Sequence, residues 1–329
     1  MSFAKLPNIT CVKRSLPAIY LDSCAVIELA RYNYGICSCK YKNEIGELFN
    51  MLSSLMNSNK ILCPYGNQLS EIGMTTKRDK SRNFLFNFTN DRFLEPNSIY
   101  INQLQVGYQS FIKKDEKIVL NICDAYDEAY SLTSLKVFAT PIYDENEAES
   151  LKNEKEHISD ILNEIKKSGR TKKNFYEQLK AELETDKTLL YFNGFANSIT
   201  TEEAFQMYFS ELEKFYTITG LPAGCNDIDF NNELLQYTAF LDSLHHHVLP
   251  YIWIQSNIWA YLMQRQNKIL KSDNLDVKWA SAYLPYVDFV ITDTNFCKTL
   301  NETKLAEQYN VKTYSMSTLH ELINELKKL

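Results

Sequence analysis

Short apolar runs alternate with amphipathic stretches near the N-terminus of the chain. Residues 18–21 form an apolar run that ends at Asp22, and this pattern predicts a buried strand followed by a helix capped by Ser23. Residues 42–57 carry apolar side chains at helical spacing, which predicts an amphipathic helix. The apolar run 60–63 predicts a second buried strand, because proline and glycine follow it closely.

The C-terminal end of the chain repeats this alternation. Residues 273–283 have the capping residues and the apolar spacing of a helix, and the run 288–292 predicts a strand. Residues 311–314 predict a further strand, and a last helix is expected over 318–329. Strands that alternate with helices are typical of a mostly parallel sheet with helices on both faces. The sequence therefore predicts an α/β protein with three layers.

The middle of the chain has a different pattern, with few strand-like runs. Residues 147–190 are highly charged and have helical periodicity, interrupted at Ser168, which predicts a solvated helical hairpin. We therefore expect one α/β domain that is split between residues 1–80 and 266–329, with a mostly α-helical insertion over 81–265.

Four carboxylates lie where such a sheet exposes its chemistry. Asp22 and Asp293 directly follow predicted strands, and Asp276 lies in the first turn of the helix before the second of these strands. Glu71 lies in a helix that is predicted to begin near Gln68. Because ligands of α/β proteins bind outside the carboxyl ends of the strands, we expect these side chains to converge at that edge.

Converging carboxylates suit a hard divalent cation. Mg²⁺ and Mn²⁺ favour oxygen ligands, whereas a cluster of carboxylates without an ion repels itself. A bound ion lowers the pKa of a coordinated water and stabilises charge on a phosphate, so a histidine or cysteine nucleophile is not required. Each of the four acids also has an ordinary structural interpretation, as a helix cap, a turn residue or a solvated helix residue.

Three segments of the chain resemble the PIN-domain nuclease family. The string Ile19–Ile27, in which Asp22 precedes Ser23, resembles the strand–Asp–Ser/Thr–helix opening of that family. Asp276–Phe296 resembles its second half, in which an Asp opens an Ala-containing helix and a strand ends in a Thr–Asp motif, and Val311–Ile323 resembles its last strand and helix. The resemblance implies a Rossmann-like, PIN-like parallel sheet and a metal-dependent nuclease, whose metal-binding acids correspond to Asp22, Glu71, Asp276 and Asp293.

The chain departs from this family in length and in one motif. The resemblance covers residues 15–80 and 270–329, and the remaining insertion is open to roles as a substrate clamp, a dimer surface or a partner-binding module. Thr294 and Asn295 occupy positions where other members carry a further acid, so binding of one ion or of two stays open. Asp273 and Asn295 are the candidates for supporting roles.

The charge balance argues against a protein that coats nucleic acid in general. The 329 residues include 35 basic and 41 acidic side chains, for a net charge of −6, although local basic patches can still bind phosphates. One basic run follows Glu71, and its candidates for phosphate contacts are Lys77, Arg78, Lys80 and Arg82. A second basic cluster lies at 166–173, and both runs also fit an ordinary solvated surface.

The cysteines and the N-terminus point to a reducing compartment. The 8 cysteines are scattered, and Cys37 and Cys39 lack a second pair that would complete a zinc site. The adjacent histidines at 245–247 fan about 100° apart on a helix, so they do not converge on an ion. The N-terminus lacks the apolar run of a secretion signal, and the most apolar stretch, 248–262, is too short and too polar to cross a bilayer. We therefore expect a cytoplasmic protein without a membrane span.

The leading functional expectation is a metal-dependent phosphodiesterase that uses Mg²⁺ or Mn²⁺ to cut nucleic acid. The resemblance favours RNA over DNA, hence an endoribonuclease, because most relatives cut RNA. Such relatives often serve as toxins or phage-defence effectors, which implies a protein inhibitor or activator, and a homo-oligomer stays open. The alternatives are a structure-specific DNA nuclease and a catalytically silent PIN-like scaffold that binds a partner protein.

Overall fold

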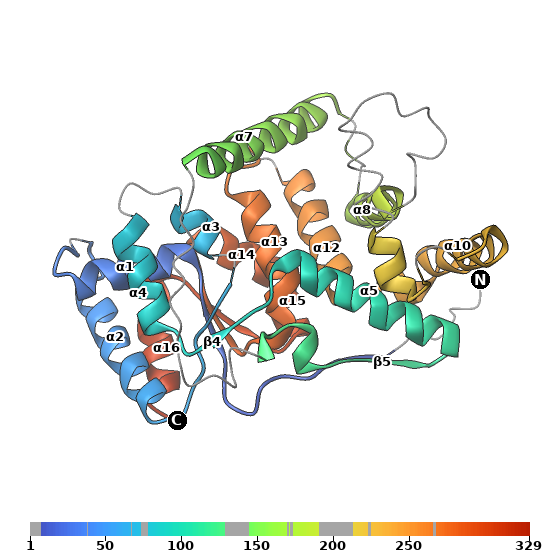
Figure 1. The fold of residues 1–329 in the computed structure, drawn as a ribbon. Coiled ribbons are helices and arrows are strands. Elements are labelled where there is room, and N and C mark those ends of the chain that lie inside the picture. Colours follow the sequence, from blue (N-terminus) through green and yellow to red (C-terminus); the bar gives the residue numbers. More distant parts are fainter. Residues whose placement is uncertain are drawn as a thin grey trace.

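A parallel sheet with helices on both faces lies at the centre of the molecule (Figure 1). The computed structural model describes residues 8–329 except 38, 67, 74–77, 129–144, 170, 172–173, 191–212, 223–224 and 266–267. The α/β class expected from the sequence is confirmed, with short parallel strands and a large share of helix. Among the described residues, no helix has both the length and the hydropathy needed to span a membrane.

In the described part of the chain, the main sheet has three regular strands, and its first strand in the chain is β2 (Ile19–Leu21). This strand pairs in parallel with β6 (Phe289–Ile291), and β6 pairs in parallel with β7 (Lys312–Tyr314). These strands come from opposite ends of the chain, as the alternating pattern predicted. Their parallel pairing brings the carboxyl ends of β2 and β6 side by side.

The sheet continues on the other side of β2. Ala18 bridges to Leu62, and the chain runs on into β3 (Pro64–Tyr65), which pairs in parallel with β4 (Asp91–Arg92). Regular pairing thus begins just after the run 60–63 that predicted this strand. From β2 the chain moves outward first to β3 and β4, and later in the opposite direction to β6 and β7. Such a reversal marks the ligand-binding position of an open α/β sheet.

Alternate side chains of β2 enter hydrophobic cores on the two faces of the sheet. Ile19 and Leu21 pack in one core with α1 (Ser23–Asn33), α2 (Lys42–Asn57) and α16 (Leu319–Leu326). A strand with both faces buried reads as a continuous apolar run, which is the pattern seen at 18–21.

The opposite face is covered by two helices from the second half of the chain. Ala18 and Tyr20 belong to a core that includes α12 (Pro250–Gln264) and α13 (Asp273–Tyr283). The Tyr20 ring stacks on the Trp279 ring with centroids 4.8 Å apart. Helices therefore pack on both faces of β2.

Several predicted helices are confirmed, with differences at their ends. The helices expected at 42–57 and 273–283 have the predicted bounds. The cap of α1 was predicted wrongly: Asp22 rather than Ser23 is its N-cap, because the Asp22 carboxylate accepts the N–H of Ser23. The last helix begins later than predicted, after a short 3-10 turn that Ser315 caps.

The expected insertion contains the predicted charged helices, but they contact different partners. α7 (Glu145–Lys167) lies against α13, whereas α8 (Phe175–Leu190) packs on α12 (Figure 1). Elements around and beyond the expected boundary at residue 80 also pack with the sheet. α4 (Arg78–Phe88) contacts α1, and α5 (Pro96–Lys113) contacts α13. These segments therefore share a core with the two predicted halves.

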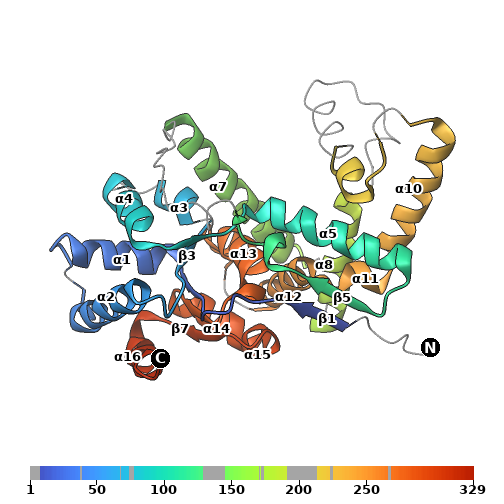
Figure 2. The same ribbon diagram turned by 60° about the horizontal axis from the view of Figure 1, so that its bottom comes forward.

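A second, two-stranded sheet lies beside α5. β1 (Asn8–Cys11) pairs in parallel with β5 (Lys117–Leu120), a strand that the sequence pattern did not predict. The helix α10 (Asp227–Leu241) packs with it in a third hydrophobic core, and α11 (Leu244–His247) contacts α5 and α10 (Figure 2). His246 is fully buried against a phenylalanine ring of α10.

Candidate metal centre

The predicted acids meet at the carboxyl edge of the sheet, where the strand order reverses. Asp22 directly follows β2, and Asp293 follows β6 after one intervening residue, Thr292. Asp276 reaches this edge from the first turn of α13, and Glu71 reaches it from α3 (Gln68–Gly73). All four line one pocket of about 520 Å³. Carboxylate oxygens of Asp22, Asp276 and Asp293 lie within 4.8 Å of one another.

Asp22 is held by donors from its own loop and from the end of β6. The Thr292 hydroxyl donates to Asp22 Oδ2 at 2.7 Å, and the Ser23 N–H donates to Oδ1 at 2.6 Å. Burial, followed by repulsion from Glu71, raises the pKa of Asp22 to about 7, although the bonds from Thr292 and Ser23 oppose the rise. This carboxyl can therefore keep its proton near neutral pH, and a cation at this position would have to displace that proton.

Asp276 is buried on the α13 side of the pocket, with 5% of the residue exposed. The indole N–H of Trp279 donates to its Oδ1 at 3.4 Å. Burial first, and then repulsion from Asp22 and Glu71, raises the pKa of Asp276 well above its ordinary value. A divalent cation would offset both the desolvation and the repulsion. Because every donor of the group is a carboxylate oxygen, the site fits Mg²⁺ or Mn²⁺ better than a soft metal.

Glu71 lies beside the three-acid group and lines the same pocket. The Ser23 hydroxyl donates to Glu71 Oε2, which ties this residue to the loop that carries Asp22. The Lys155 ammonium of α7 lies 3.4 Å from Glu71 Oε1. This ion pair neutralises one negative charge at the rim of the pocket.

The two residues expected to support the acids are not part of the described pocket lining. Asn295 is exposed, and its backbone N–H donates to Asp293 Oδ1 at 2.7 Å as part of a helix cap. Asp273 Oδ2 accepts bonds from Arg265 at 3.2 Å and from the N–H of Leu270 at 2.8 Å. The Asp273 carboxylate thus stabilises the segment before α13.

The basic residues predicted to bind phosphates do not belong to the described lining of the pocket either. Lys77 and the side chain of Arg78 lie outside the described part of the chain. Lys80 is exposed on α4, with its ammonium 5.4 Å from the centre of the Tyr34 ring. Arg82 is only 6% exposed, and such burial speaks against the predicted phosphate contact.

Lysines that the sequence did not single out line the pocket instead. Lys152 and Lys155 come from α7, and Lys271 comes from the segment just before α13. Lys155 pairs with Glu71, and Lys271 pairs with Glu156 at 2.6 Å. The charge pattern of α7 predicts only a solvated face, because its approach to the sheet edge is a tertiary contact that no local signal encodes.

Replacing Thr292 with valine is expected to weaken metal binding near neutral pH. The Thr292 hydroxyl favours the ionised form of Asp22, so its loss raises the pKa of that carboxyl further and lets a proton displace the cation. The affinity for Mn²⁺ should fall about tenfold near pH 7 and recover at about pH 8.5, as measured by titration calorimetry. Thr299→Val is the matched control, since Thr299 is buried on α14 (Thr294–Glu302) and donates to the carbonyl of Asn295. Equal losses in both variants would contradict the role given to Thr292.

A second group of possible ligand atoms lies at the end of α1. The Sγ atoms of Cys37 and Cys39 are 3.7 Å apart, and the Glu28 carboxylate lies near both. A structural zinc site closes its coordination with four protein ligands, and the structure describes three here. Neither cysteine forms a disulfide in the part of the chain that the structure describes.

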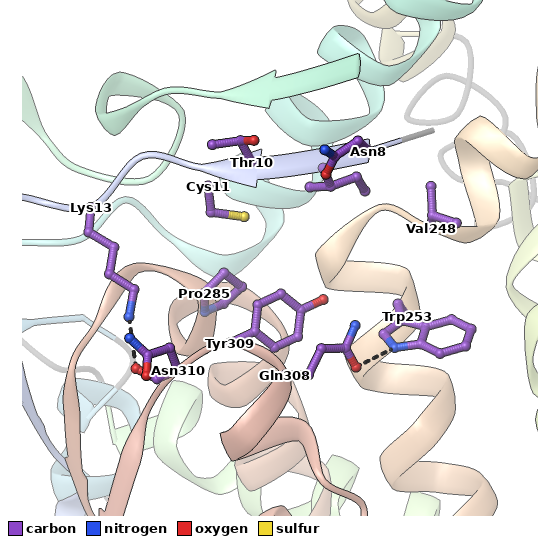
Figure 3. A pocket seen from close by; sticks show the side chains of 11 residues that line it. Asn8, Thr10, Cys11, Lys13, Val248, Trp253, Pro285, Gln308, Tyr309 and Asn310 are labelled. Atoms are coloured by element: carbon purple, nitrogen blue, oxygen red, sulfur yellow. Dashed lines mark hydrogen bonds between the residues drawn. The ribbon is translucent and has the colours of Figure 1, made fainter. Parts of the chain in front are cut away.

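A larger pocket, of about 740 Å³, lies between β1, α12 and α15 (Leu305–Gln308) (Figure 3). Its described lining contains no carboxylate. Lys13, the cation in it, donates to the backbone carbonyl of Val287 at 2.6 Å, and the Trp253 indole donates to Gln308 at 3.0 Å. These polar groups bond to other parts of the fold, so the acidic pocket remains the better candidate for a reaction centre.

Comparisons with known proteins give no relative for this chain. No family model, no curated protein and no solved structure matches it.

Proposed function

We propose that this chain is a metal-dependent nuclease, a phosphodiesterase with a PIN-like, Rossmann-like sheet domain. The observation that carries the proposal is the approach of carboxylate oxygens of Asp22, Asp276 and Asp293 to within 4.8 Å of one another. Their pocket lies at the switch point of a parallel sheet, which is where open α/β folds place ligands. The resemblance of the segments around these acids to PIN-domain motifs supports the same activity.

Each acid has a part in this proposal. Asp22, Asp276 and Asp293 hold a Mg²⁺ or Mn²⁺ ion, and Glu71 completes the acidic wall, where it is placed to share in binding a second ion. When bound, such an ion supplies a water that ionises near neutral pH and positive charge that stabilises the phosphate during cleavage. Thr292 keeps Asp22 oriented and ionised through its hydrogen bond.

The substrate class comes from the resemblance and from the chemistry of the pocket. RNA is the proposed substrate, so the chain is proposed to be an endoribonuclease. A role as a toxin or defence effector, controlled by an inhibitory or activating protein, follows from the same analogy.

A cleavage assay tests the proposal. Purified protein is incubated with labelled single-stranded RNA, duplex RNA and DNA, in Mg²⁺ or Mn²⁺ and in EDTA. We expect cleavage of RNA that requires the metal and that is lost in Asp22→Asn and Asp293→Asn, because both variants remove a ligand charge. Cleavage that survives EDTA and both substitutions would overturn the proposal.

The other outcomes separate the alternatives. Metal-dependent cleavage of DNA alone would identify a DNA nuclease. An inert protein that binds Mn²⁺ only weakly would indicate a scaffold. An inert protein that binds Mn²⁺ well, and that loses this binding in Asp22→Asn, would point to a required activator.

A further inference from the structure

One face of α7 lines one side of the acidic pocket. Lys152, Lys155 and Glu156 are spaced three and four residues apart on a helix, so they project from the same face. All three line the pocket with the four acids, and Lys271 lines it from the neighbouring segment. In Figure 1, α7 passes over α13, which carries Asp276, and one of its ends lies next to α3, which carries Glu71.

Buried hydrogen bonds fix α7 in this position. Further along the same face, the Ser159 hydroxyl and the Asn163 amide donate to the carbonyl of Ile269 at 3.1 and 2.9 Å. The Ile269 N–H in turn donates to Asn163 Oδ1 at 2.9 Å, and the Lys166 ammonium donates to the carbonyl of Leu262 at 2.8 Å. The second half of the helix is thus anchored to the last turn of α12 and to the segment between α12 and α13. Its first half is thereby held over the pocket.

The lysines offset part of the negative charge of the pocket. Five carboxylates line the pocket (Asp22, Glu71, Glu156, Asp276 and Asp293), and together they repel a phosphodiester chain. A metal ion can neutralise charge only at the phosphate that is cut. The phosphates on either side need other cations, and the pocket offers them in Lys152, Lys155 and Lys271.

We infer that α7 is a clamp for single-stranded nucleic acid, in which Lys152, Lys155 and Lys271 bind the phosphates that flank the scissile bond. The inference rests on the proposed nuclease function and narrows its substrate. The pocket beside α7 is open to solvent, and its volume of about 520 Å³ is that of a small-ligand site. The phosphates of a duplex follow the fixed path of a stiff double helix, whereas a single strand can bend its backbone to reach lysines that come from two segments of the chain.

A binding experiment tests the clamp without cleavage. In the background of Asp276→Asn, which prevents cutting, the affinity for a labelled single-stranded RNA and for its duplex is measured by fluorescence anisotropy at several salt concentrations. The double variant Lys152→Ala and Lys271→Ala should bind the single strand about tenfold more weakly, and the slope of log Kd against log salt should shrink by about 1.4, or about 0.7 for each lost contact. Both side chains are largely exposed, so folding is expected to be unaffected.

Lys167→Ala is the matched control, because Lys167 is exposed on the same helix and lies more than three turns from Lys152 and Lys155. It should keep the affinity and the salt slope of the parent. In the cleaving protein, the double variant should raise KM for single-stranded RNA with kcat nearly unchanged. Duplex of the same sequence should bind and be cut at least tenfold less well.

The outcomes separate this inference from the nuclease proposal. If the parent cuts RNA but the lysine variants bind and cut as it does, or if duplex is cut equally well, the clamp is wrong and the nuclease stands. If the parent cuts nothing in any metal and binds Mn²⁺ only weakly, yet single-strand binding depends on Lys152 and Lys271, then α7 is a phosphate-binding surface without a scissile bond, and the nuclease proposal fails. A parent that binds no single strand overturns the clamp.

Discussion

The variant Asp276→Asn is expected to lose metal-dependent cleavage while it keeps the fold. Asparagine has nearly the size of aspartate and can still accept the Trp279 indole N–H, but it brings no charge to the cation. Loss of a buried ligand removes several kcal/mol of charge stabilisation, and each 1.4 kcal/mol corresponds to about tenfold in rate. We expect kcat/KM to fall by about a thousandfold or more, measured with labelled single-stranded RNA in Mn²⁺.

The matched control for this variant is Asp273→Asn. Asp273 lies in the same first turn of α13 and is also buried, but its carboxylate bonds to Arg265 and to the N–H of Leu270. Asparagine keeps one acceptor for Leu270, so kcat/KM should stay within about threefold of the parent and Mn²⁺ binding should persist. Similar losses in the two variants, or a fully active Asp276→Asn, would contradict the geometry assigned to the pocket.

The comparison of these two acids illustrates what the sequence could and could not predict. Both lie in a helix whose bounds the sequence predicted, because a polar cap precedes it and Pro285 follows it. The strand ends at Asp22 and Asp293 were predictable for a similar reason, since short apolar runs mark buried parallel strands. The direction in which the Asp273 side chain points was not predictable, because it depends on the contact with Arg265 and on a turn of the preceding segment.

Contacts between distant parts of the chain limited the prediction of the cationic residues. The run that contains Arg82 looked like a phosphate-binding surface, but α4 packs on α1 and buries this arginine. The lysines of α7 looked like a solvated face, yet Asn163 and Ile269 fix that helix over the pocket. Charge alone does not distinguish these cases, since the outcome depends on which helix face finds a tertiary partner.

Removal of metal is expected to destabilise the protein more as the pH rises. Burial and neighbouring carboxylates raise the pKa of Asp22 from its ordinary value of 3.8 to about 7. Between these two values the folded protein keeps a proton that the unfolded chain has released. The stability contributed by this carboxyl is therefore largest below about pH 4, and it is lost as the pH rises towards 7.

The variant Asp22→Asn isolates this effect, because asparagine does not titrate. In EDTA the variant and the parent should melt alike near pH 4, whereas at about pH 8 the variant should melt on the order of 5 °C higher, since a few kcal/mol of repulsion and desolvation are removed. In millimolar Mn²⁺ at about pH 8 the order should reverse, because the parent gains stability from binding and the variant does not. Asp160→Asn, at an exposed position of α7, controls for the loss of one charge. It should leave the Tm unchanged both in EDTA and in Mn²⁺. Two results together would contradict the proposed metal centre: a parent whose Tm does not change with Mn²⁺ at about pH 8, and a variant that melts at a lower temperature than the parent in EDTA. They would mean that the buried acids stabilise the fold and bind no metal.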